Sequence, residues 1–284
     1  MRTAVAEPAP GSGETDGETV NRRRLTTRGP VEFLDVRRVR LVEAGSLRMT
    51  PEEQQAVDRL WTQAVAGNPH LFDGPLVACT GLRRPRPGVL ELRWVRATYR
   101  HRALRLVRAP GTWVPSPVFV TVLQPTDEGL VVGRGSGTTA GPGRWGLPGG
   151  SAEPPGTAGL PLDEAALRRH AARELAEETG VGAEPGGLTL HAVTRGEYGK
   201  VGLHFLAPRL PAALVRSRHR GLLAAHAARG DEPELDRLAF VRSAAELHGL
   251  GPQADYVPQL VARWAAPQRA GEGQLRNSLR RGGA

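Results

Sequence analysis

The sequence has few of the residues that build several common scaffolds and sites. Cys79 is its only cysteine, which excludes an internal disulfide framework and a cysteine-based zinc site. No apolar run approaches the roughly 18 residues that a transmembrane helix needs. The first 30 residues also lack the apolar stretch of a secretory signal. We therefore expect a cytoplasmic protein that does not enter a membrane.

Aromatic residues are scarce at 5%, whereas the net charge is +9. Lys200 is the only lysine, so almost all of the positive charge comes from arginine. A basic surface can bind nucleic acid, but the sequence has no recognised motif for reading bases and few aromatic side chains on which bases would stack. Nucleic-acid binding is therefore the least favoured function.

The composition divides the chain into two folded units between two tails. The tails, residues 1–30 and 268–284, are rich in glycine and polar residues without periodicity, and we expect them to be disordered. Residues 31–110 predict a small α+β unit, and residues 111–267 predict a second unit that follows a Pro-Gly break. A chain of 284 residues suits two such units.

Local patterns predict the elements of the first unit. Thr50, Pro51 and Glu53 mark a helix start, because Thr50 can cap the helix and Glu53 can close a capping box. The helix is expected to end at about Ala66, before a Gly-Asn-Pro stop. Strands are expected over residues 31–43, 75–82 and 88–96.

The second unit begins with a predicted hairpin and ends with a predicted helix. Residues 117–124 read as a buried strand, and residues 130–134 follow the turn Thr-Asp-Glu-Gly and are expected to pair back on it. A closing helix is expected near residues 255–265.

Three glutamates share one face of a helix predicted over residues 163–179. Glu174, Glu177 and Glu178 are three and four residues apart, so they lie one turn from each other. Like charges at this spacing repel, and the C-terminal end of a helix also disfavours negative charge. The pattern indicates either oxygen ligands for Mg²⁺ or Mn²⁺, or a solvated acidic face.

The surrounding residues resemble the signature of the Nudix hydrolase family. Its second half, Arg-Glu-apolar-any-Glu-Glu-any-Gly-apolar, is matched at every specified position from Arg173 to Val181. The frequent preamble, Trp-x-Leu-Pro-Gly-Gly-x-x-Glu, runs from Trp145 to Glu153. The first half departs from the pattern, because Ala165 stands at the position of a signature glutamate and extra residues separate the loop from the helix.

The resemblance implies a fold, a reaction and a cofactor. The fold would be of the α/β (α+β) class, with a mixed curved sheet between helices and a small N-terminal α+β extension. The reaction would be the hydrolysis of a nucleoside diphosphate linked to another group, without a covalent intermediate. One to three divalent ions, Mg²⁺ or Mn²⁺, would neutralise the diphosphate and activate water.

The resemblance also assigns roles to residues of this chain. Arg173 would orient the glutamates through charge-assisted hydrogen bonds, and Glu174 or Glu178 would act as the general base. Glu153 is expected to bind substrate. The expected metal ligands are the carbonyl of Gly150 and the side chains of Glu174, Glu177 and Glu178. Three downstream acids are alternative bases or ligands, or ordinary loop residues: Glu197, Glu232 and Glu234.

Several other residues have two interpretations. His191 and His204 lie between apolar neighbours, and we favour structural histidines over metal ligands. Four aromatic residues are expected either to stack a nucleobase or to pack in the core: Trp113, Trp145, Tyr198 and Phe205.

The first unit indicates a substrate class. Residues 68–74, Asn-Pro-His-Leu-Phe-Asp-Gly, resemble a stretch in a Nudix subgroup that acts on UDP-glucose and similar nucleotide sugars and that carries a small β/α extension. That resemblance implies hydrolysis of a nucleotide sugar to a nucleoside monophosphate and a sugar 1-phosphate. The alternatives are ADP-ribose, a dinucleotide or a nucleoside triphosphate, or a Nudix-fold binding module without catalysis. Assembly as a homodimer is left open.

Overall fold

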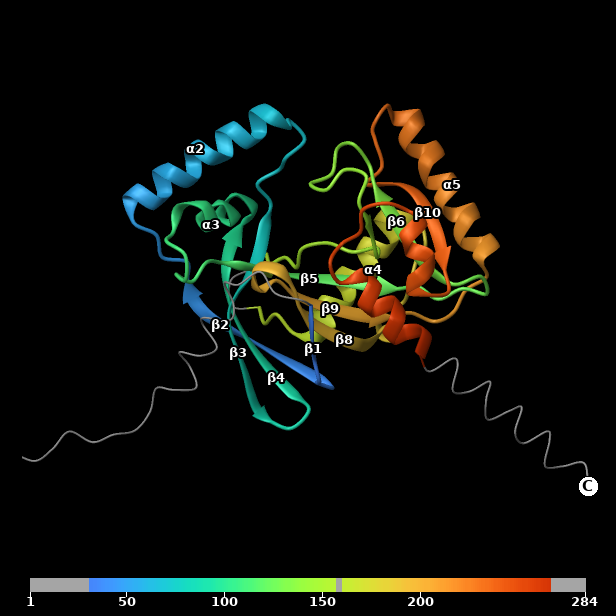
Figure 1. The fold of residues 1–284 in the computed structure, drawn as a ribbon, viewed down its shortest axis with the longest axis horizontal. Helices are drawn as coiled ribbons and strands as arrows, with labels where there is room; N and C mark the ends of the chain where they lie inside the picture. The colour runs from blue at the N-terminus through green and yellow to red at the C-terminus, as the bar shows by residue number, and fades with distance from the viewer. Residues whose placement is uncertain (1–30, 157–159, 267–284) are drawn as a thin grey trace, which may run out of the picture.

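The computed structural model describes residues 31–156 and 160–266 (Figure 1). The two tails that were expected to be disordered, residues 1–30 and 268–284, lie outside this part of the chain. Among the described residues, no helix is both long and apolar enough to cross a membrane.

Two β-sheets form the centre of the structure. The larger is a seven-stranded mixed sheet with the strand order β1-β8-β9-β5-β3-β4-β2, and the smaller has the order β10-β6-β7. The strands of the larger sheet are β1 (Glu32–Leu34), β2 (Arg38–Ser46), β3 (Pro75–Arg86), β4 (Val89–Thr98), β5 (Ser116–Leu123), β8 (Thr189–Arg195) and β9 (Val201–Leu206). Those of the smaller sheet are β6 (Leu130–Gly135), β7 (Trp145–Gly146) and β10 (Leu235–Val241).

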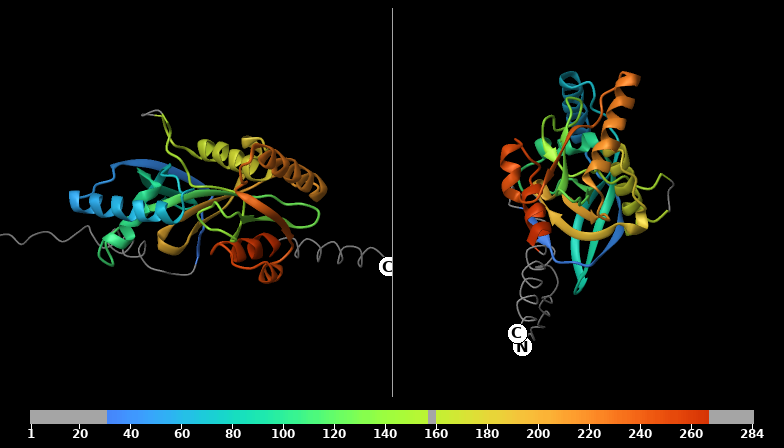
Figure 2. Two further views of the ribbon diagram at one scale, coloured as in Figure 1. Left: turned by 90° about the horizontal axis from the view of Figure 1, so that it is seen from above. Right: turned by 90° about the vertical axis from the view of Figure 1, so that its right-hand side faces the viewer.

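Helices cover both faces of the larger sheet. Figure 2 shows α4 (Glu164–Thr179) on one side and the helix of residues 257–266 on the other. The named α-helices are α2 (Pro51–Gly67), α3 (Leu104–Val107), α4 (Glu164–Thr179) and α5 (Ala212–Arg229). Short 3₁₀ turns are η1 (Tyr99–Ala103), η2 (Pro185–Gly187), η3 (Glu197–Gly199) and η4 (Ala244–Gly249). The expected fold class, a mixed curved sheet between helices, is confirmed.

The two predicted units contribute strands to the same sheet. β1, at the start of the first unit, pairs antiparallel with β8 of the second. β3 pairs with β5 through Ala78 opposite Pro117 and Cys79 opposite Ser116. One buried apolar cluster likewise contains residues of both units, including Trp94. Residues 31–110 and 111–267 therefore share one sheet and one core.

The helix of the first unit begins as predicted. The amide of Glu53 donates to Thr50 Oγ1 at 3.2 Å, and the amide of Thr50 donates to the Glu53 carboxylate at 3.1 Å. This reciprocal pair is the capping box that the sequence indicated. The helix ends at Gly67, one residue beyond the expected end.

Two strand predictions are wrong in their pairing. The strand expected over residues 31–43 is two strands, because β1 joins β8 whereas β2 joins β4. The expected hairpin is also absent as a strand pair, because β5 lies between β9 and β3 whereas β6 lies between β10 and β7. The turn between β5 and β6 forms as expected, with the amide of Thr126 donating to the carbonyl of Gly129 at 2.8 Å, and the pairing continues as far as the bridge between Pro125 and Leu130.

Candidate active site

Helix α4 carries the predicted glutamates against the sheet. Asp163 caps its start by accepting a hydrogen bond from the amide of Ala166 at 2.7 Å. Gly180 ends it in the left-handed conformation, with φ of 73°. Apolar side chains of α4, among them Leu167 and Leu175, are buried in the core. The helix is therefore fixed at both ends and along one face, which sets the direction of its glutamates.

The loop before α4 runs along strand β5. The amide of Val122 donates to the carbonyl of Pro148 at 2.8 Å, and the amide of Val120 donates to that of Gly150 at 2.9 Å. A Cβ on Gly149, which has φ of 151°, would lie 2.1 Å from the carbonyl oxygen of Val120. Only glycine fits so close to a neighbouring backbone, so this position requires it.

The Gly-Gly pair brings the loop into contact with two of the glutamates. The amide of Gly149 donates to Glu178 Oε2 at 2.7 Å. A Cβ on Gly150 would lie 2.5 Å from Glu174 Oε2, so the Glu174 carboxylate occupies the space that a side chain would fill. The loop and α4 thus form one unit around these two carboxylates.

Both of these carboxyl groups hold their protons more tightly than usual. Burial, followed by the nearby Glu234 and Glu177, raises the pKa of Glu174 to about 7. Burial also raises the pKa of Glu178 well above its ordinary value, although the hydrogen bond from Gly149 opposes the shift. Removing these carboxylates from water and placing them together is unfavourable without a cation.

Arg173 links the predicted residues to each other. Its Nη2 lies 3.1 Å from Glu153 Oε1 and 3.8 Å from Glu174 Oε1, and its Nε lies 3.8 Å from Glu177 Oε1. The Arg173 side chain is about half exposed, so each pair contributes little to stability. The positive charge instead lies within 4 Å of three carboxylates, Glu153, Glu174 and Glu177.

His170 is a member of this network that the sequence did not single out. Arg173 Nη2 lies 2.8 Å from His170 Nδ1, and His170 Nε2 lies 3.1 Å from Glu174 Oε1. Burial lowers the pKa of His170, which favours the neutral ring. A donor at Nδ1 then leaves the ring proton on Nε2, beside Glu174. The spacing of four residues between His170 and Glu174 on one helix was the signal available in the sequence.

A downstream acid joins the carboxylates from another element. Glu234 directly precedes β10, and its charge helps to raise the pKa of both Glu174 and Glu178. The side chain of Glu197 lies outside what the structure describes. Of the two downstream acids whose side chains the structure describes, Glu232 and Glu234, it is Glu234 that lies close enough to affect the glutamates of α4.

The carboxylate oxygens of this site suit a hard divalent cation. The expected ligands do not, however, all converge on one point. Carboxylate oxygens suit Mg²⁺ or Mn²⁺, and such ions commonly complete their coordination with water and substrate phosphates. Within the described residues, no three His, Cys, Asp or Glu side chains form a ready-made cluster for a metal ion. Glu177 is 62% exposed, and the carbonyl of Gly150 accepts the amide of Val120.

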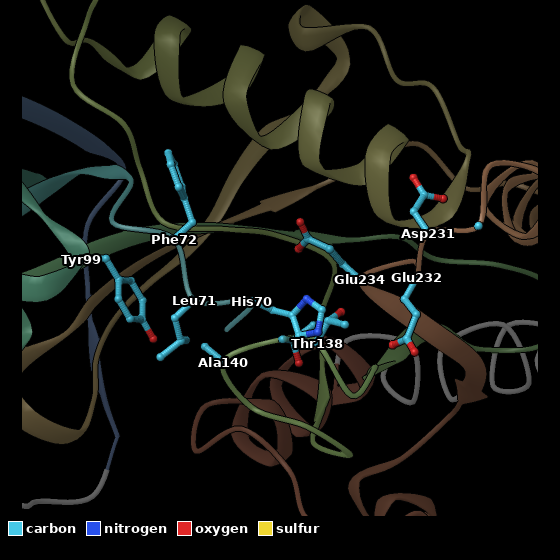
Figure 3. Close-up of a pocket in the computed structure, with 11 residues that line it drawn as sticks. His70, Leu71, Phe72, Tyr99, Thr138, Ala140, Asp231, Glu232 and Glu234 are labelled. Carbon is cyan, nitrogen blue, oxygen red and sulfur yellow. The ribbon is translucent and has the colours of Figure 1, made fainter. Parts of the chain in front are cut away.

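A cavity of about 760 Å³ adjoins the carboxylates at Glu234 (Figure 3). One wall comes from the first predicted unit and the other from loops of the second. The residues that line it are His70, Leu71, Phe72, Tyr99, Thr138, Thr139, Ala140, Gly230, Asp231, Glu232 and Glu234. The lining of the cavity therefore includes an acid that lies close to the α4 glutamates.

The aromatic residues at this cavity differ from those considered in the sequence. Trp145 and Phe205 are buried in the core, so they do not offer a face to a nucleobase. Phe72 is 79% exposed and lines the cavity together with Tyr99. Phe72 lies within the Asn-Pro-His-Leu-Phe-Asp-Gly stretch, which was the signal available for it.

His204 has the structural role that was favoured for it. It is fully buried, with Nδ1 2.7 Å from Thr121 Oγ1 and Nε2 2.7 Å from Thr194 Oγ1. Both ring nitrogens are thus satisfied by neutral hydroxyl groups. Burial lowers the pKa of His204 to about 3, so the ring stays neutral at physiological pH.

A family model described as NUDIX domain matches residues 115–256, which is half of the chain. No curated protein matches the sequence at a significant level. The solved structure of a MutT protein from Methanosarcina mazei Go1 is 17% identical, covers 54% of this chain and 95% of its own, and has a TM-score of 0.34.

Two further solved structures are similar at the same level. The NUDIX domain of Shewanella oneidensis NrtR, complexed with ADP ribose, is 16% identical over 60% of this chain and 97% of its own, with a TM-score of 0.36. A bifunctional NMN adenylyltransferase/ADP ribose pyrophosphatase from Francisella tularensis, complexed with AMP and a manganese ion, is 18% identical over 50% of this chain and 37% of its own, with a TM-score of 0.29. At these scores the structures do not distinguish one substrate from another.

Proposed function

We propose, from the premise that this chain belongs to the Nudix domain family and is a Nudix pyrophosphohydrolase, that it hydrolyses the diphosphate of a nucleotide sugar. The products would be a nucleoside monophosphate and a sugar 1-phosphate. The single observation that carries the proposal is the group of carboxylates at α4 and Glu234, which adjoins a cavity large enough for part of a substrate. Members of this family use a divalent metal ion, and we propose Mg²⁺ or Mn²⁺ here.

The residues of the site have separate roles in this proposal. Glu174, Glu177 and Glu178 would hold the metal ion, with Glu234 beside them and the carbonyl of Gly150 as a further ligand. When bound, the ion neutralises the diphosphate and lowers the pKa of a water molecule. Arg173 keeps Glu153, Glu174 and Glu177 in place by its charge.

Proton transfer and substrate positioning are assigned to side chains of the same network. Glu174 or Glu178 would accept the proton of the attacking water, because these two side chains are much less exposed than that of Glu177. Glu153 would position the substrate from the loop while Arg173 holds its carboxylate at 3.1 Å. The proposed compartment is the cytoplasm, because Cys79 is a free and buried thiol.

The nucleotide-sugar assignment depends on the first unit of the chain. The stretch that resembles the nucleotide-sugar subgroup forms one wall of the cavity, through His70, Leu71 and Phe72. ADP-ribose, a dinucleotide or a nucleoside triphosphate would use the same carboxylates. A binding module without catalysis is disfavoured by the retained glutamates, since without a metal ion they only repel each other.

The test is the release of phosphate-containing products from a panel of diphosphate compounds. The panel contains UDP- and GDP-sugars, ADP-ribose, a dinucleotide and a nucleoside triphosphate, each with Mg²⁺, Mn²⁺ or a chelator. We expect metal-dependent cleavage, with the highest kcat/KM for a nucleotide sugar. If ADP-ribose is cleaved preferentially, ADP-ribose replaces the nucleotide sugar as the proposed substrate, and metal-dependent hydrolysis of a diphosphate remains the proposed reaction. Thermal stabilisation by a compound without any cleavage would support a binding module instead.

A further inference from the structure

The cavity at Glu234 combines segments that are far apart in the sequence. His70, Leu71 and Phe72 follow α2, whereas Thr138 and Glu232 belong to loops of the second unit. In Figure 3, Phe72 and Tyr99 lie on one side of the view and Glu232 on the other, with the carboxylate of Glu234 between them, and His70 lies beside Thr138. The side of the cavity away from α4 is thus formed by residues outside the signature region.

The exposed ring of Phe72 is presented by an ordered loop. The amide of His70 donates to Asn68 Oδ1 at 3.1 Å, which fixes the start of the loop. A Cβ on Gly74 would lie 3.1 Å from the Phe72 ring, so the ring lies over this glycine. The Phe72 ring is 79% exposed, and its loop is fixed. The ring can therefore be removed from water only by a bound molecule that covers it.

The other end of this loop is tied to the second aromatic residue of the cavity. The amide of Tyr99 donates to the carbonyl of Gly74 at 3.0 Å. Asp73 accepts the amide of Arg100 at 2.8 Å and lies 3.0 Å from Arg100 Nε. Phe72 and Tyr99 are therefore held at a set position relative to each other, as a binding wall requires.

The negative charges that line the cavity favour an uncharged ligand over an anionic one. Three carboxylates line it, and among its described lining residues there is no arginine or lysine. Asp231 is paired with His226 at 2.9 Å and with Arg229 at 3.1 Å, which leaves Glu232 and Glu234 as the acids that a ligand would meet. Carboxylates accept hydrogen bonds from hydroxyl groups and repel phosphate or carboxylate groups.

We propose that this cavity is the sugar subsite, in which Phe72 covers one face of the sugar ring and Glu232 accepts its hydroxyl groups. This assignment rests on the proposed hydrolysis of nucleotide sugars and adds which end of the substrate lies against the first unit. It predicts a preference for neutral sugars, because the cavity offers stacking and hydrogen-bond acceptors but no cation. Thr138 and Thr139 also line the cavity and supply further hydroxyl groups.

The first experiment separates the sugar end from the nucleoside end. Phe72→Ala is compared with Leu106→Ala, which removes an exposed apolar side chain (69% exposed) elsewhere on the surface. We expect Phe72→Ala to raise the KM for UDP-glucose roughly tenfold with little change in kcat. The inhibition constant of glucose 1-phosphate should rise by a similar factor, and that of UMP should stay the same. Leu106→Ala should change none of these values.

The second experiment tests the charge of the cavity. UDP-glucose and UDP-glucuronate differ at C6, where the second sugar carries a carboxylate. Glu232→Lys should raise the ratio of kcat/KM for UDP-glucuronate to that for UDP-glucose about tenfold, because a repulsive charge is replaced by an attractive one. Glu232→Gln should produce a smaller change in the same direction. Melting temperatures of all variants report whether they fold.

The outcomes distinguish this assignment from the proposed function. If the wild-type chain cleaves UDP-glucose but Phe72→Ala leaves its KM and the inhibition by glucose 1-phosphate unchanged, the sugar subsite is refuted and the hydrolase stands. A selective change in UMP inhibition would place the nucleoside in this cavity and would also refute the assignment. Absence of nucleotide-sugar cleavage by the wild-type chain would overturn both proposals.

Discussion

Glu178 is the glutamate of the site whose charged form is most strongly disfavoured by burial. Its side chain is buried, and because the pKa is raised in the folded state, the metal-free protein loses stability as the pH rises above the ordinary pKa of a glutamate, where the unfolded chain ionises first. The shape of the side chain is retained in glutamine, but its charge is not. The substitution Glu178→Gln therefore separates a role in catalysis from a role in folding.

We expect Glu178→Gln to lower kcat by roughly a hundredfold or more, because a metal-binding charge is lost. In chelator at pH 8 its melting temperature should equal or exceed that of the wild type. Glu164→Gln is the matched control, since Glu164 lies on the same helix and pairs with Arg168 outside the site. Full activity of Glu178→Gln would contradict the assignment of this residue.

His204 gives the protein a defined response to acid. Its pKa falls from an ordinary 6.5 to about 3 in the folded state, so the unfolded chain binds the proton first as the pH decreases. The stabilising contribution is therefore complete above pH 6.5 and is lost as the pH falls toward 3. The slope should approach about 1.4 kcal/mol per pH unit from this residue.

Urea unfolding at pH 7, 6 and 5 measures this contribution. The free energy of unfolding should fall more steeply for the wild type than for His204→Gln. Equal slopes for the wild type and His204→Gln would show that this histidine does not titrate as the structure implies.

The sequence predicts the contacts of the site only where they lie within one helix. Arg173, Glu174, Glu177 and Glu178 lie within two turns of α4, so their proximity follows from helical geometry. The contact between Arg173 and Glu153 joins two elements and depends on the folded loop. The proximity of Glu234 to α4 depends on where β10 lies in the fold. No local pattern in the sequence predicts that position.

At the level of elements, the loop before α4 contains two adjacent glycines with different functions. A Cβ on Gly149 would collide with the backbone of β5, which cannot move without breaking the sheet. The atoms nearest to a Cβ on Gly150 belong to the end of the Glu174 side chain, which is flexible and can rotate. One glycine therefore maintains the fold and the other positions the carboxylate.

This difference predicts opposite phenotypes for two alanine substitutions. Gly149→Ala should lower the free energy of unfolding by roughly 3 kcal/mol or more, since the strain is in the backbone. Gly150→Ala should melt within a few degrees of the wild type but lose at least roughly tenfold in kcat, because Glu174 is displaced. Denaturant unfolding and steady-state kinetics measure the two effects. Similar losses of stability in both variants would contradict the separation of roles.

Elements were predicted well where their signals are local. The capping box of α2 and the Asp163 and Gly180 ends of α4 are fixed by side chains within a few residues of each helix end. Strand pairing was predicted poorly, as the separation of β5 from β6 shows. An alternating or apolar pattern identifies a strand, but the partner is chosen by the packing of the whole sheet.

At the level of the whole molecule, the first unit is part of the fold of the second. β1 pairs with β8, and β3 pairs with β5, so both edges of the strands β5, β9 and β8 depend on residues before position 110. The shared core contains residues from both units, such as Trp94 and Val118. Composition alone indicated a boundary but gave no information on this sharing.

Residues 111–267 are therefore not expected to fold by themselves. The isolated segment would expose the edge of β5 and the apolar residues that β3 and β4 cover, which favours aggregation. Circular dichroism during heating should show a cooperative transition for the full chain and none for the segment. A cooperative transition with metal-dependent activity in the segment would show that the first unit is dispensable.

The most direct test of the account is the fate of the anhydride bond in UDP-glucose. The full chain is incubated with UDP-glucose and Mg²⁺ in ¹⁸O-labelled water, with chelator as the parallel sample. The predicted products are UMP and glucose 1-phosphate, one of which carries the label on phosphorus, and the chelator should abolish their formation. Formation of UDP and glucose, or product formation that is unaffected by chelator, would contradict metal-dependent hydrolysis of the diphosphate.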